Sequence, residues 1–182
     1  GATPNGWRRC SKQEYQYPRF KGEVSPKIHS FKTEKEASSL LKKYAFKVGA
    51  DEVGVAEIEP SDIYKGRKVN GKYAIVLGQR MLWRKFQEVP SNESAIECLR
   101  VYFSLGEVVI QLADHIRSLG YECKVEHPIG DSDVLHIPLA LKAGFGELGR
   151  HGSIIQPKMG PLFRVGSVIT DLPLAIDHPI DA

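Results

Sequence analysis

The residues with the clearest chemical pattern are three glycines in the stretch AGFGELGRHG: Gly144, Gly146 and Gly149. Their G-x-G-x-x-G spacing holds a dinucleotide pyrophosphate when a strand precedes the glycines and a helix follows them. Here the order is reversed, because residues 138–143 are typical of a short helix capped by Gly144, and residues 152–157 are typical of a strand. We therefore reject a dinucleotide loop and predict that the glycines allow another close approach of the backbone.

The cysteines and histidines do not form the pattern of a metal site. The cysteines are odd in number, far apart and in no C-x-x-C pair: Cys10, Cys98 and Cys123. These spacings predict neither a disulfide framework, nor a zinc site, nor an iron–sulfur cluster. The histidines are dispersed, and only three lie near the glycines: His127, His136 and His151. We therefore expect no metal ligands within the chain.

Composition sets the broad class of the protein. A chain of 182 residues with 42% apolar and 26% charged residues is typical of one globular domain. The net charge of +3 is small and the cations are scattered, so we expect no nucleic-acid partner. No apolar run approaches the roughly 20 residues that cross a bilayer, so we expect a soluble chain without a transmembrane segment. Its compartment stays open: cytoplasmic, or exported after removal of a leader that would precede residue 1.

Two amphipathic helices are expected to position the candidate residues. Capping boxes mark their starts, Thr33 with Glu36 and Ser94 with Glu97. Apolar residues then recur at helical spacing until the glycines at positions 49 and 120.

Short apolar runs bounded by turn residues are typical of strands. They lie at residues 53–58, 73–78, 121–126 and 162–170, and Gly166 is expected to break the last one. These elements predict an α+β fold in which helices pack on a sheet of mixed direction. We expect a single domain over residues 31–182, preceded by an extended N-terminal arm over residues 1–30.

The order of these elements, and the residues within them, resemble the cobalamin-binding core of the reductive dehalogenases and, more distantly, epoxyqueuosine reductase. The resemblance covers most of residues 33–175 and is carried by the glycine-rich stretch and its surroundings: residues 102–112, 116–121, 154–157, 160–161, Arg164 and 170–174. It implies a nitroreductase-like fold that buries a corrinoid, with cobalamin in the base-off form, its lower nucleotide tail displaced from cobalt.

The resemblance also implies roles for individual residues. Tyr102 matches a tyrosine that donates a proton as the carbon–halogen bond is reductively broken, and Arg150 matches a basic residue that activates it. This chemistry is reasonable, because a phenol is protonated at neutral pH and a neighbouring guanidinium favours the phenolate. The turn is expected to lie against the corrin through these residues: Gly144, Gly146, Gly149, His151, Gly152, Ser153, Ile155 and Pro157. In the alternative interpretation, the glycines only form a tight turn and Tyr102 is a core aromatic.

The sequence departs from the family in two places. Asp131 stands where an asparagine is usual, and His136 replaces a small polar residue, so the substrate is not implied. Family members also continue from a segment like residues 173–181 into a region that binds two iron–sulfur clusters, whereas this sequence ends there. We therefore expect no iron–sulfur cluster in the chain and an external electron-donor protein as its partner.

The leading hypothesis is a corrinoid-binding domain of the reductive dehalogenase type, an oxidoreductase that removes halogen from an organohalide if an external donor supplies electrons. The alternative is a non-catalytic corrinoid carrier or scavenger. A third hypothesis is an FMN-dependent reductase, because related scaffolds hold FMN.

Overall fold

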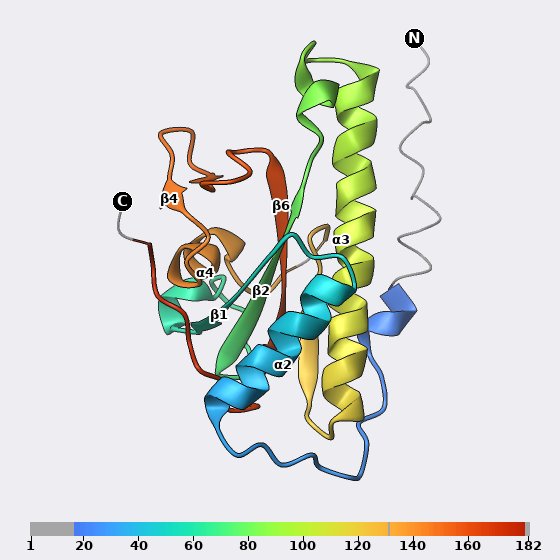
Figure 1. The fold of residues 1–182 in the computed structure, drawn as a ribbon, viewed down its shortest axis with the longest axis vertical. Coiled ribbons are helices and arrows are strands. Elements are labelled where there is room, and N and C mark those ends of the chain that lie inside the picture. Colours follow the sequence, from blue (N-terminus) through green and yellow to red (C-terminus); the bar gives the residue numbers. More distant parts are fainter. Residues whose placement is uncertain (1–16, 131, 181–182) are drawn as a thin grey trace.

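The structure, a computed structural model, describes residues 17–130 and 132–180. Its centre is a four-stranded sheet with the order β1-β2-β6-β3, shown in Figure 1. The strands are β1 (Glu52–Glu57), β2 (Tyr73–Arg80), β6 (Phe163–Thr170) and β3 (Cys123–Glu126). All three strand pairs are antiparallel, so the predicted mixed direction of the sheet is wrong. The prediction of helices packed with a sheet in one domain is confirmed.

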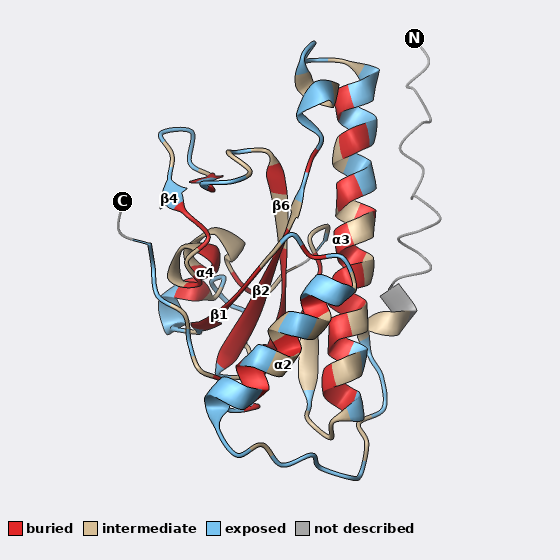
Figure 2. Ribbon diagram, viewed as in Figure 1, coloured by how far each residue is buried: buried red, intermediate tan, exposed pale blue. Residues whose placement is uncertain are grey.

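Helices cover both faces of this sheet. The helices α2 (Glu34–Lys47) and α3 (Asn92–Ser118) pack on one face, and α4 (His136–Lys142) packs on the other. Strand β2 therefore alternates between two cores: Tyr73, Ile75 and Leu77 contact the first cluster, and Ala74 and Val76 the second. This explains the continuous apolar run in its sequence. Figure 2 shows β2 buried along most of its length and a buried stripe on α3.

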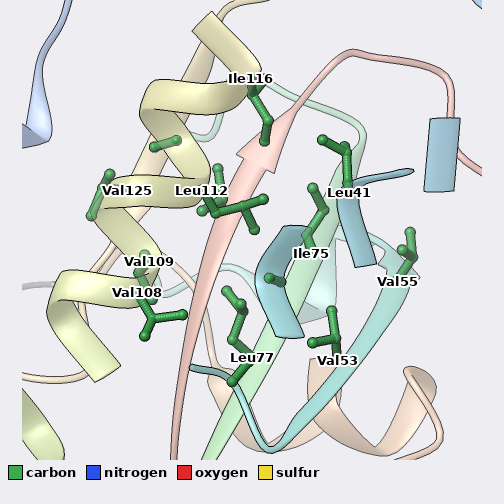
Figure 3. Packing of buried hydrophobic residues seen from close by; sticks show 14 of the residues in the cluster. Leu41, Val53, Val55, Ile75, Leu77, Val108, Val109, Leu112, Ile116 and Val125 are labelled. Carbon is green, nitrogen blue, oxygen red and sulfur yellow. The ribbon is translucent and has the colours of Figure 1, made fainter. Parts of the chain in front are cut away.

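The larger core lies between α2, α3 and the sheet, as Figure 3 shows. Leu41 of α2, Ile75 of β2 and Leu112 of α3 are fully buried in it. Burying side chains of this size stabilises the fold by about 1.5–3 kcal/mol each. This core fixes α3 against the sheet, and α3 in turn carries Tyr102.

The predicted starts of the two long helices compare differently with the structure. At α2 the prediction is confirmed, because Thr33 Oγ1 accepts a hydrogen bond from Glu36 N at 3.1 Å. At α3 it is wrong by three residues, because Ser91 is the N-cap and exchanges hydrogen bonds with Ser94. Glu97 instead accepts Leu82 N at 2.8 Å and two bonds from Arg100 at 2.7 Å, which holds the segment before α3.

Strand β6 continues through Gly166, so the predicted break is also wrong. A Cβ atom at this position would lie 3.0 Å from Val109 Cγ2 and 3.1 Å from Pro128 Cδ. The glycine therefore allows α3 and the segment after β3 to approach the strand closely.

Both ends of the described chain run along the helices. Of the predicted N-terminal arm, residues 1–16 lie outside the described residues, and the following segment is bonded to α3 through Ser25 N and Arg117 O at 2.9 Å. At the other end, the Asp177 carboxylate accepts Val55 N at 2.7 Å and Lys42 Nζ at 2.6 Å. It thus joins α2 to the edge strand β1. Over the described residues, no helix has the length and apolar character needed to cross a membrane.

Candidate functional site

A hollow of about 140 Å³ opens where α3, the start of α4 and β6 meet. Its lining combines polar and apolar side chains: Tyr102, Pro128, His136, Ile137, Ser153, Phe163, Arg164 and Val165. Tyr102 and Ser153 are thus the two predicted site residues that line one space.

The polar centre of this hollow is a pair formed by Tyr102 and Arg164. The guanidinium carbon of Arg164 lies 4.6 Å from the centroid of the Tyr102 ring. This geometry gives a cation–π attraction of about 0.5–2 kcal/mol. Arg164 Nη2 also donates a hydrogen bond to Cys98 Sγ at 3.3 Å, and its buried Nε has no hydrogen-bond partner among the described residues.

In this geometry the arginine beside Tyr102 is Arg164, and the role of Arg150 stays a prediction. Arg150 is exposed at the tip of a hairpin and is not among the residues that line the hollow. The signal in the sequence was the alternation of strand side chains, which puts Arg164 on the same face as Gly166 and Val168, and in the structure this face of β6 lies toward α3. That alternation places Arg164 on the same side as Tyr102.

His136 also lines the hollow, and the sequence drew attention to it as a departure from the family and as one of three histidines near the glycines. Its Nδ1 lies 3.4 Å from Ser167 Oγ, and its Nε2 is buried without a hydrogen-bond partner in the described part of the chain. Burial lowers the pKa of His136 to about 4, partly offset by a hydrogen bond with the backbone of His127. The ring is therefore neutral at pH 7.

His127 lies close to His136, in a space that α3 leaves open. Burial also lowers the pKa of His127, and its ring stacks on Phe20 with centroids 5.2 Å apart. Gly106 makes the room, because a Cβ atom there would overlap His127 Nε2. A glycine inside a long helix costs about 1 kcal/mol relative to alanine, so its presence was a usable signal of close packing.

The glycine-rich stretch has two parts with different backbone structures, the end of α4 and a hairpin. In the first, Gly144 has φ +76° and ends α4 as predicted: Gly144 N donates to Leu141 O at 3.1 Å and Phe145 N to Ala140 O at 2.9 Å. A Cβ atom on Gly144 would lie 2.7 Å from His178 O, and one on Gly146 would overlap Ile155 O. These two glycines are explained by packing within the chain, as the tight-turn interpretation expects.

The second part is a hairpin of β4 (Glu147–Leu148) and β5 (Ile154–Ile155). Gly149 N donates to Ser153 O at 2.7 Å, and Gly152 N donates to Gly149 O at 3.0 Å, which leaves Arg150 and His151 exposed at the tip. Gly152 has φ +77° and open space where a side chain would be, whereas the His151 ring occupies that space at Gly149. Pro157 follows the hairpin and is also exposed.

Apolar side chains are exposed on both sides of this region. Leu148 and Ile155 of the hairpin are 59% and 48% exposed, and Trp83 and Ile96 near the start of α3 are 68% and 65% exposed. In Figure 2, the hairpin and the segment before α3 are largely exposed above the sheet. Within residues 17–130 and 132–180, no three metal-ligating side chains are grouped.

Comparisons with known proteins identify the class of this fold. No family model matches the chain. The tetrachloroethene reductive dehalogenases of Dehalobacter restrictus and Desulfitobacterium hafniense are 35% and 34% identical over 132 residues, which cover 72% of this chain and 23% of each relative. Epoxyqueuosine reductase of Escherichia coli is 37% identical over 78 residues, 42% of this chain and 18% of that protein.

Solved structures from the same two families resemble the fold of this chain. A reductive dehalogenase whose structure suggests a mechanism for B12-dependent dehalogenation has a TM-score of 0.82 at 25% identity, over 92% of this chain and 26% of that one. Epoxyqueuosine reductase of Bacillus subtilis shares the fold with a TM-score of 0.60 at 15% identity, over 82% of this chain and 49% of that one. The chain is a homologue of the reductive dehalogenases, and epoxyqueuosine reductase is a more distant relative. It spans about a quarter of the length of the dehalogenases that it matches.

Proposed function

We propose that the chain is a cobalamin-binding domain of the reductive dehalogenase type, and that the hollow beside Tyr102 receives an organohalide. The observation that carries this proposal is the Tyr102–Arg164 pair, a phenol with a guanidinium over its ring at the wall of an open hollow. Homology with dehalogenases supports the chemistry.

The residues present fit a small substrate in the hollow and a flat ligand outside it. A volume of about 140 Å³ is close to that of a cavity that holds benzene, about 150 Å³, and is too small for a macrocycle. The hairpin offers what a corrin with amide groups needs: apolar Leu148 and Ile155, open backbone at Gly152, the Ser153 hydroxyl and polar Arg150 and His151. A nitroreductase-like arrangement and the base-off form of cobalamin are parts of this proposal.

The cobalt of the bound cofactor would supply the electrons that break the carbon–halogen bond. The chain's own residues supply the proton and its control. Tyr102 donates its hydroxyl proton to the carbon that loses the halogen, and Arg164 stabilises the phenolate that remains. Arg150 serves as a contact for the ligand on the hairpin. An external protein is proposed as the electron donor.

A binding experiment tests the cofactor. The purified chain is mixed with hydroxocobalamin, freed of unbound ligand and examined by visible absorption, and we expect a corrinoid spectrum with a base-off shape. Loss of all corrinoid on washing, before and after reduction, refutes the proposal. Flavin fluorescence released on denaturation would instead select an FMN-dependent reductase.

A turnover experiment tests the chemistry. With bound corrinoid and a strong chemical reductant, Tyr102→Phe is expected to lower the rate of halide release at least tenfold while corrinoid binding persists. Tyr121→Phe is the matched control, because the Tyr121 hydroxyl donates to His29 O at 2.9 Å and does not line the hollow. Tight corrinoid binding without halide release from any organohalide would select the carrier or scavenger.

A further inference from the structure

Arg164 is held in an unusual way for a cation in a folded chain. No carboxylate of the described residues pairs with it, and the hydrogen bond of its Nη2 goes to the thiol of Cys98 at 3.3 Å. Cys98 and Tyr102 are one turn apart on α3, so the same helix face presents the thiol and the ring to one guanidinium.

The thiol itself is oriented by a second sulfur atom. Cys98 Sγ donates toward Met81 Sδ at 3.9 Å, and Met81 is 4% exposed. With its proton directed at Met81, the thiol has lone pairs available to accept the Arg164 N–H. The contacts thus run in sequence from buried Met81 to Cys98, to Arg164 and to the Tyr102 ring.

A neutral acceptor has a specific advantage at this position. A carboxylate would bind the guanidinium more strongly and cancel its charge, whereas a thiol fixes its orientation and leaves the charge acting on the phenol. We propose that Cys98 is a positioning residue, which holds the Arg164 guanidinium over the Tyr102 ring without neutralising it. The catalytic meaning of this contact rests on the proposed function, but the contact itself does not.

The test uses the chain without corrinoid, so that its result does not depend on cofactor binding. Tyrosine rings are labelled with ¹³C, the Tyr102 signal is assigned with Tyr102→Phe, and Arg164→Met defines the full effect of the cation on that signal. Cys98→Ala and Cys98→Val are expected to reproduce more than half of this change. Cys98→Ser keeps an acceptor and is expected to stay nearer to the wild-type signal.

Cys123→Ala is the control, because the Cys123 thiol donates to Ala113 O at 3.3 Å and does not contact Arg164. If both apolar variants leave the Tyr102 signal at its wild-type position, or if Arg164→Met does not move it, the inference is overturned. Once corrinoid binding is shown, Cys98→Ala is expected to lower kcat severalfold with unchanged corrinoid affinity. A chain that binds no corrinoid would refute the proposed function while the ring signals still decide the role of Cys98.

Discussion

Acid should destabilise this fold through His136. Burial lowers the pKa of His136 from its ordinary value of 6.5 to about 4, because the ring is desolvated at the wall of the hollow. A histidine whose pKa is lower in the folded state contributes stability that is fully present above the pKa of the unfolded chain and is lost as the pH falls. The loss therefore begins near pH 6.5 and grows until about pH 4.

The size of the effect follows from the shift. Each pKa unit is worth about 1.4 kcal/mol, so protonation of His136 should lower the free energy of unfolding by up to about 2 kcal/mol between pH 7 and pH 5. Urea denaturation of the wild type and His136→Gln at both pH values measures it. The variant should lose about 2 kcal/mol less than the wild type on acidification, whatever its stability at pH 7.

Comparing the loss of stability in the two proteins separates the effect of His136 from that of the other buried histidines. Burial also lowers the pKa of His127 and of His115, so both proteins should lose some stability in acid. Only the difference between the two proteins reports on His136. Equal losses in the wild type and in His136→Gln would refute the reasoning, since the ring would then titrate alike in the folded and unfolded states.

Three further substitutions or reactions test other contacts. Asp177→Ala removes the acceptor of Val55 N and of Lys42 Nζ, and should lower the free energy of unfolding, measured by urea denaturation, by about 1–3 kcal/mol. A change below about 0.5 kcal/mol would contradict the stabilising role of Asp177. Gly106→Ala places a Cβ on His127 Nε2 and should lower the melting temperature, although alanine favours helices; a rise would contradict the packing. Burial raises the pKa of Cys123 to about 11, so iodoacetamide at pH 8 should leave this thiol unmodified until urea is added, as mass spectrometry of the peptides can show.

The sequence was sufficient to predict those helix ends that depend on residues only a few positions apart. Thr33 caps α2 and Gly144 ends α4, because each needs only neighbours within a few residues. At α3 the predicted capping box of Ser94 and Glu97 does not form, and Ser91 is the N-cap instead. The Glu97 carboxylate instead accepts a hydrogen bond from Leu82 N, fifteen residues earlier, and such a contact is not visible in a local pattern.

The strand directions could not be predicted from local patterns, because strand pairing also depends on distant parts of the sequence. Strand β6 is the last in the sequence, yet it lies between β2 and β3. Its pairing with β2 joins segments about ninety residues apart and its pairing with β3 joins segments about forty-five residues apart, so only the tertiary structure decides both. The same insertion carries Arg164 into the centre of the site, whereas Arg150, which is nearer to the glycines in sequence, lies at an exposed tip.

The geometry of the site depends on one small residue in that central strand. Gly166 lies two residues after Arg164, and a Cβ atom there would lie 3.0 Å from Val109 Cγ2 of α3. Val109 is two helical turns beyond Tyr102, so the close contact at Gly166 fixes the distance between α3 and β6 next to the reactive pair. Figure 1 shows the two elements side by side along this length. Because the guanidinium must lie within about 6 Å of the ring to attract it, the separation set by glycine is what permits Arg164 to act on Tyr102.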